Sequence, residues 1–148
     1  MRSTRRFSVG VSLALALASM VVLSGGAMAG GRPMTIELTG AAEAPGPGDP
    51  DGSGTASFTF NAGTGEVCFE YSVTDVAPLT AAHIHIAPAG SPGPVVIPMP
   101  PSSPTGGSGC VTADRDLIVA ILMDPSGYYF NVHNDDFQPG ALRGQLTR

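Results

Sequence analysis

Lysine is absent from this 148-residue sequence, and arginine is scarce. Three of the seven arginines, Arg2, Arg5 and Arg6, precede the first apolar segment, so the remainder has four arginines against twelve acidic residues, a formal charge of −8. Without a cluster of basic side chains, the chain offers no electrostatic attraction to phosphate groups. We therefore expect no nucleic acid and no anionic membrane surface among its partners.

No apolar run is long enough to cross a membrane comfortably. The longest covers residues 9–23, whereas a spanning helix needs roughly 20 residues. Basic residues precede this run and small residues follow it up to Ala29, which is the pattern of a secretory signal peptide. We predict a signal peptide over residues 1–29 and a single domain over residues 30–148. The product is expected to be secreted, extracellular or periplasmic, and free of the membrane, since no lipid-attachment cysteine follows the run.

Cysteine occurs only twice, as Cys68 and Cys110. An even pair in an exported domain favours a disulfide. Because Cys68 faces away from the apolar side of its expected strand, we expect the disulfide to join that strand to whatever covers its polar side. Two thiolates serving a metal ion are the alternative, which export disfavours.

Alternation of apolar and polar residues, typical of half-buried strands, recurs along the chain between clusters of glycine and proline. Only residues 114–124 change to helical spacing, with acidic residues in the first turn and Pro125 after the last. The pattern predicts a mainly β domain with one short helix, either an antiparallel β-sandwich or a Greek-key barrel of about seven or eight strands. The expected strands are residues 34–39, 54–61, 66–73, 81–86, 95–97, 110–112, 128–133 and 141–146.

Histidine occurs only three times. His83 and His85 are two residues apart in an expected strand, so both rings project from one face, and His133 lies in another expected strand. Neutral imidazole is a good ligand for copper and zinc. One interpretation is therefore a mononuclear site formed by all three rings; a binuclear site of the superoxide dismutase kind needs more histidines than the chain has.

The alternative is a hydrogen-bonded polar network that sets the register between strands without any ligand. Asn131 lies on the same strand face as His133, and Arg143 and Gln145 are the other polar candidates. We expect at most one of Arg143 and Gln145 to face the histidines. Arg143 is further expected to form an internal ion pair with an acidic side chain; the candidates are Asp124, Asp135 and Asp136.

Four sequence segments occur in series at residues 82–85, 93–96, 128–133 and 139–146. Together they resemble the CHRD domain, which is named after animal chordin. The similarity extends weakly upstream of them, through residues 52–56 and 65–68, and so covers nearly all of the chain after the predicted signal peptide. The resemblance implies a bacterial, secreted, single-domain, β-rich module with no established catalytic activity.

The sequence therefore favours a non-enzymatic binding or structural module. No serine, histidine and acid occur at a spacing typical of nucleophilic catalysis, so we expect no catalytic residue. No cofactor is expected, and the partner would be an extracellular or periplasmic protein or a small ligand. The alternative hypothesis is a mononuclear copper or zinc protein that uses His83, His85 and His133.

Overall fold

The computed structural model describes residues 31–148, and the predicted signal peptide, residues 1–29, lies outside the described residues. Within the described part of the chain, every expected strand and the expected helix are present. The elements are β1 (Arg32–Thr39), η1 (Gly40–Ala42), β2 (Ser53–Asn61), β3 (Glu66–Thr74), β4 (Leu79–Ile86), β5 (Val95–Pro98), β6 (Gly106–Thr112), α1 (Arg115–Met123), η2 (Pro125–Gly127), β7 (Tyr128–Asn134) and β8 (Leu142–Gln145).

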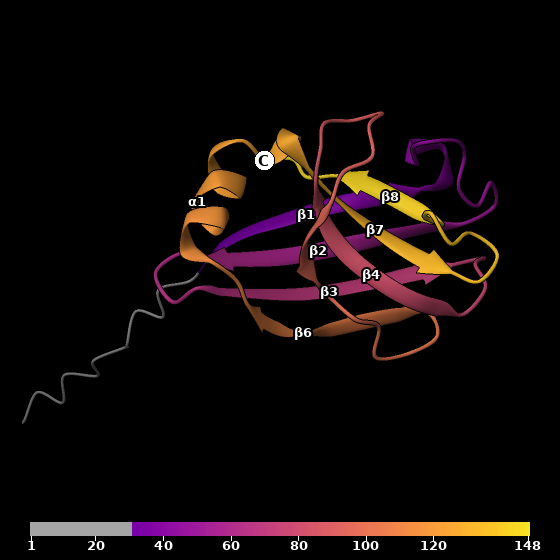
Figure 1. Ribbon diagram of the computed structural model, residues 1–148. Helices are drawn as coiled ribbons and strands as arrows, with labels where there is room; N and C mark the ends of the chain where they lie inside the picture. The colour runs from indigo at the N-terminus through magenta and orange to yellow at the C-terminus, as the bar shows by residue number, and fades with distance from the viewer. Residues whose placement is uncertain (1–30) are drawn as a thin grey trace, which may run out of the picture.

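All eight strands belong to one antiparallel sheet, in the order β5-β4-β7-β8-β1-β2-β3-β6. The sheet curls into a half-barrel, so that β4 and β7 lie over β2 and β3 (Figure 1). Curling lets one sheet bury its apolar face against itself, as two sheets do in a sandwich. The predicted fold class, mainly β and antiparallel with one helix, is confirmed.

The apolar residues of the alternating pattern meet inside the curl. Phe130 of β7 contacts Phe58 of β2 and Tyr71 of β3, with ring centroids 5.3 and 5.0 Å apart. Ile118 and Ile121 of α1 are fully buried, and the helix covers one end of the half-barrel (Figure 1). Because burial of apolar surface is the main favourable term in folding, these contacts hold the two halves of the sheet together.

Asp114 caps the start of α1. Its Oδ1 accepts hydrogen bonds from the backbone N–H groups of Asp116 at 2.8 Å and Leu117 at 3.1 Å. Such a cap satisfies two of the N–H groups that every helix start leaves without an intrahelical partner. Pro125, just beyond the helix, cannot continue it, and the predicted helix is confirmed with each end one residue shorter.

Strand β6 begins four residues earlier than the sequence predicts, within a segment expected to be a loop. Gly106 and Gly107 pair with β3 so closely that a Cβ would lie 2.4 Å from the Tyr71 carbonyl oxygen at Gly106 and 2.7 Å from the Tyr71 hydroxyl at Gly107. Glycine is therefore needed here for close approach between strands. Glycines carry no apolar alternation, which is why the pattern missed this part of the strand.

The disulfide between Cys68 and Cys110 is confirmed. The two cysteines are directly paired residues of the neighbouring strands β3 and β6, on the polar face of the sheet. The expectation that the bond reaches a separate covering element is wrong, because the partner strand lies beside β3 in the same sheet. With both sulfurs in the disulfide, the alternative of a thiolate metal site is contradicted; no free cysteine occurs in residues 31–148.

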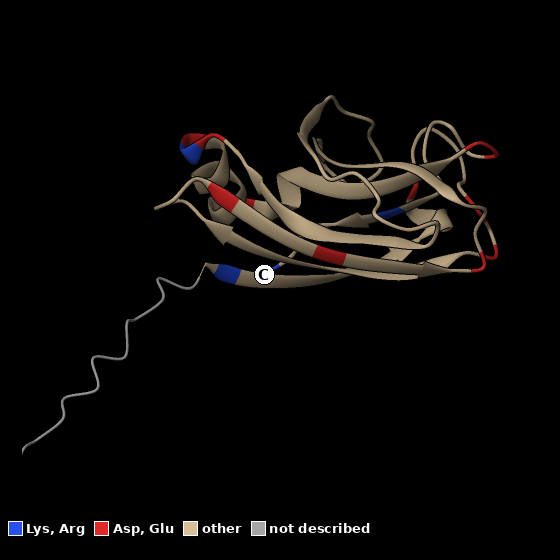
Figure 2. Cartoon of the chain, turned by 90° about the horizontal axis from the view of Figure 1, so that it is seen from below, with Lys and Arg blue, Asp and Glu red and all other residues tan. Residues whose placement is uncertain are grey.

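The few charged residues are scattered over the domain (Figure 2). In this view the arginines lie apart from one another, and acidic residues occupy loops at both ends as well as the polar face of the sheet. No helix within residues 31–148 is long and apolar enough to cross a membrane.

We predict that replacing both cysteines by alanine lowers the free energy of unfolding by about 4 kcal/mol, the chain-entropy value for a closed loop of 42 residues. The measurement is urea unfolding of the oxidised wild type and the double variant. As a control, a reducing agent should shift the wild-type midpoint and leave that of the variant unchanged. Equal midpoints for all four samples would contradict the prediction.

Candidate metal centre

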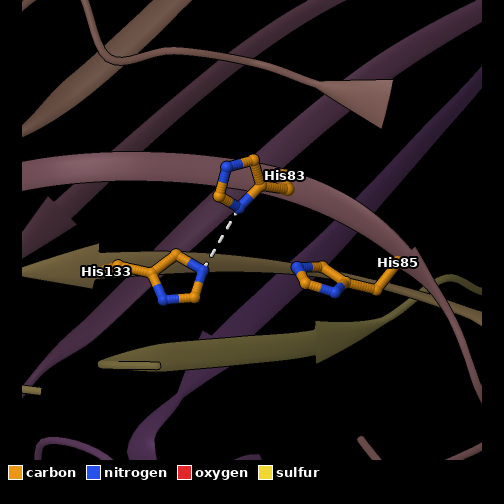
Figure 3. Close-up of side chains that lie close together, drawn as sticks. All are labelled: His83, His85 and His133. Atoms are coloured by element: carbon orange, nitrogen blue, oxygen red, sulfur yellow. Dashed lines mark hydrogen bonds between the residues drawn. The ribbon is translucent and has the colours of Figure 1, made fainter. Parts of the chain in front are cut away.

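The register between β4 and β7 brings the three histidines together on the polar face of the sheet. His83 pairs with Asn131, and His133 pairs with Ala81, two residues before His83. Since residues i and i+2 of a strand share a face, all three rings project from the same side of the sheet. Their ligand nitrogens all lie within 4.8 Å of one another (Figure 3).

Backbone carbonyls hold two of the three rings in one tautomer. His85 Nδ1 lies 2.8 Å from the Gly93 carbonyl oxygen, and His133 Nδ1 lies 2.9 Å from the Gln138 carbonyl oxygen. A carbonyl oxygen only accepts, so Nδ1 carries the hydrogen in both rings. When either ring is neutral, Nε2 therefore carries its lone pair. Figure 3 shows both Nε2 atoms directed into the cluster, where that of His133 shares a hydrogen bond with His83 Nδ1.

The lone pair of His85 Nε2 has no hydrogen-bond partner although the atom is buried. The ring is 8 % exposed and stacks on Tyr129, with centroids 4.7 Å apart. The environment of His133 Nε2 differs, because this atom lies 3.3 Å from His83 Nδ1 and 3.0 Å from Asn131 Oδ1. The cluster thus gathers nitrogen and oxygen lone pairs around one point.

The electrostatics keep His83 and His133 neutral. Burial, together with the neighbouring His133 and His85, lowers the pKa of His83 to about 4. Burial also lowers the pKa of His133, against the opposing effect of its bond to the Gln138 carbonyl. Neutral imidazoles are the form that binds a metal ion.

A loop of residues 87–94, here called the covering loop, rises over this face of the sheet (Figure 1). Besides the bond from His85 to Gly93, the Tyr129 hydroxyl accepts a hydrogen bond from the Gly93 N–H at 3.2 Å. Arg143 donates to the carbonyls of Ser91 at 2.9 Å and Pro88 at 3.0 Å. Side chains of the sheet thus anchor the loop that buries His85.

Arg143 and Gln145 support the covering loop and make no hydrogen bond to a histidine. The Arg143 guanidinium lies 3.4 Å from the Tyr129 ring centroid and donates to Gln145 Oε1 at 3.2 Å. Gln145 Nε2 donates to the Ala87 carbonyl at 2.9 Å. Of the predicted polar network, only Asn131 contacts the histidines directly.

Two expectations about Arg143 are wrong. Arg143 and Gln145 are two residues apart in β8, so they share a face, and both side chains lie on the histidine side of the sheet. The guanidinium bonds to carbonyl oxygens and an amide instead of pairing with Asp124, Asp135 or Asp136. The acid whose charge acts on it is Glu43.

Glu43 is the residue that sequence reasoning missed. Its Oε1 atom is buried without a hydrogen-bond partner, and burial raises the pKa of the carboxyl to about 7 despite the nearby Arg143 charge. The nearby Asn131 side chain also opposes this rise in the pKa, which links Glu43 to the residue that contacts His133. The surrounding segment, rich in proline and glycine, has no periodicity, so no spacing connects Glu43 with β7.

The fold and the site together define a class of protein: a small curled β-sheet domain with a cluster of three imidazoles on its polar face and a covering loop over His85. The CHRD domain model matches residues 34–146, most of the chain. The chain therefore belongs to the CHRD domain family, and the resemblance carried by the four segments is confirmed. No curated protein and no solved structure matches the chain.

We predict that the His83 ring of the metal-free protein titrates near pH 4, below the ordinary value of 6.5. The unfolded chain takes up this proton near pH 6.5, so the contribution of His83 to stability is lost as the pH falls from there through 4. NMR of the ring C–H signals against pH measures the midpoint. A midpoint of 6 or higher in the folded protein would contradict the assignment.

Replacing Arg143 by lysine should lower the free energy of unfolding by about 1.5–3 kcal/mol, the range for hydrogen bonds that involve a charged group. A lysine cannot reach both loop carbonyls at once. Hydrogen exchange of the Gly93 amide should accelerate as the covering loop loosens. The matched control is Arg148→Lys near the exposed C-terminus, for which we expect a change within about 0.5 kcal/mol; equal effects of the two variants would refute the anchoring role.

Proposed function

We propose that this chain is an exported, non-enzymatic member of the CHRD family that binds one copper or zinc ion through His83, His85 and His133. The predicted signal peptide and the disulfide support export, since disulfides persist in oxidising compartments. The convergence of three imidazoles at one point supports the metal ion.

The observation that carries the proposal is the buried, unpaired Nε2 of His85. A buried polar atom without a partner costs about 1–3 kcal/mol, and a bound cation removes this cost. The other nitrogen of the ring donates to the Gly93 carbonyl, the outer-shell arrangement that metal-bound histidines typically show. His133 and the Gln138 carbonyl repeat the same arrangement.

The spacing of the nitrogens suits a tetrahedral ion. Metal–nitrogen bonds of about 2.0–2.1 Å place neighbouring ligand atoms about 3.3–3.4 Å apart, and His83 Nδ1 lies 3.3 Å from His133 Nε2. The remaining nitrogen, on His85, lies within 4.8 Å of the other two, so a modest rotation of its ring completes the set.

A polar network without a ligand is the competing interpretation. It accounts for the bonds of Asn131, Arg143 and Gln145, which set strand register and hold the covering loop. It leaves His85 Nε2 unpaired, and a fully satisfied network is what makes such an arrangement stabilising. The metal-binding hypothesis explains this atom as well.

The test is metal analysis of protein stripped by a chelator and then given zinc or copper. We expect one ion per chain for the wild type. His85→Phe keeps a ring to stack on Tyr129 and removes Nε2, and we expect it to weaken binding by more than the 10- to 100-fold typical of a lost outer-shell partner.

The control variant is Glu70→Gln, which alters an exposed acid elsewhere on the polar face and should bind metal as the wild type does. The proposal fails if the wild type holds no stoichiometric ion. It also fails if replacing all three histidines lowers only the melting temperature and leaves the metal content unchanged.

A further inference from the structure

Asn131 lies at the centre of the histidine cluster. In β7 it pairs with His83 on one side and with Arg143 of β8 on the other. The residue is 1 % exposed, and its Oδ1 lies 3.0 Å from His133 Nε2. A buried amide oxygen therefore lies beside one of the three ligand nitrogens.

The orientation of this amide is determined by Glu43. The Asn131 oxygen faces His133, which leaves its NH₂ group for the Glu43 carboxyl, and the Asn131 side chain favours the ionised form of that carboxyl. Turning the amide over would place its oxygen against the carboxylate and lose this favourable interaction. Gly140 leaves room for Glu43, because a Cβ there would lie 2.3 Å from Glu43 Oε1.

When the His133 ring is neutral, neither atom in the contact between Asn131 Oδ1 and His133 Nε2 carries a hydrogen. His133 Nδ1 already carries the ring hydrogen, because it donates to the Gln138 carbonyl. Two lone pairs then face each other at 3.0 Å. A hydrogen on His83 Nδ1 satisfies the nitrogen and leaves the amide oxygen unpaired, whereas a cation at this point satisfies both atoms.

We propose that Asn131 Oδ1 is the fourth ligand of the metal ion, which makes the site His₃Asn, and that Glu43 is the positioning residue for its amide. This inference rests on the proposed function. Oxygen and imidazole ligands together suit zinc and divalent copper. Four protein ligands fill a tetrahedral site, so no position remains for a substrate, which fits a protein that holds its ion instead of using it for catalysis.

The experiment compares Asn131→Ala with the matched variant Asn134→Ala. Asn134 is a second buried asparagine of β7 whose Oδ1 accepts a bond from the Phe137 N–H, and it makes no bond to a histidine. Zinc affinity is measured by competition with a chromophoric chelator. Coordination number is read from the visible spectrum of the cobalt-substituted protein, in which four-coordinate sites absorb far more strongly than six-coordinate ones.

We expect Asn131→Ala to weaken zinc binding at least tenfold, the lower limit for loss even of an outer-shell partner, and to change the cobalt spectrum. Asn134→Ala should match the wild type in both measurements. Asn131→Asp, which keeps an oxygen at the same position, should retain tight binding and a four-coordinate spectrum. Glu43→Gln, which no longer fixes the amide orientation, should weaken zinc binding and retain the coordination number.

The outcomes separate the two proposals. A wild type that binds no metal overturns the proposed function and this inference with it. A wild type that binds metal through its histidines, with Asn131→Ala unchanged in affinity and spectrum, overturns only the fourth ligand. If Asn131→Ala does not fold, Asn131→Asp decides: a weakened, higher-coordinate site refutes the inference, and a four-coordinate site with retained affinity supports it.

Discussion

The pairing of β4 with β7 is the constraint on which the site depends. This register places His83 beside Asn131 and brings His133 within reach of both other histidines. A slip of one residue would turn one strand's polar set to the apolar side of the sheet. The aromatic contacts of Phe130 inside the curl oppose such a slip, because the same strand that carries Asn131 and His133 outward carries Phe130 inward. The packing of the core and the geometry of the site thus depend on opposite faces of the same strand, β7.

The two halves of the sheet differ in what lies on their polar faces. Over β4, β7 and β8 the covering loop buries polar side chains, and Arg143 and Gln145 hold the loop through its own carbonyls. Over β1, β2 and β3 the alternating polar residues remain exposed. The disulfide stabilises the far edge of the sheet, away from the histidines. The histidine cluster in the first half is therefore separate from the disulfide that stabilises the second.

Most of the fold was predictable because apolar alternation is a local signal. The strands follow from it, the helix follows from the local change to helical spacing, and the disulfide follows from the number of cysteines. The start of β6 was missed because its glycines carry no such signal. The site was predictable only in part. His83 and His85 lie in one strand, so their spacing alone predicts that their side chains share a face. The proximity of Glu43 and Asn131, in contrast, joins a loop to a strand far along the chain. The partners of Arg143 were mispredicted for the same reason, since they are backbone carbonyls that no residue type reveals.

By itself the sequence determined the β-rich architecture, the single helix, the cysteine pair and the family, because periodicity, residue counts and motif order are properties of the chain alone. The residues that carry the family resemblance lie in β4, in the end of the covering loop with the start of β5, in β7, and in β8 with the loop that leads into it. These elements surround the histidine cluster. Only the tertiary structure decided which nitrogen of His85 and of His133 bonds to a backbone carbonyl, which loop covers His85 and which groups lie beside Asn131. Those features depend on contacts between segments far apart in the chain, and their distances arise only when the sheet curls.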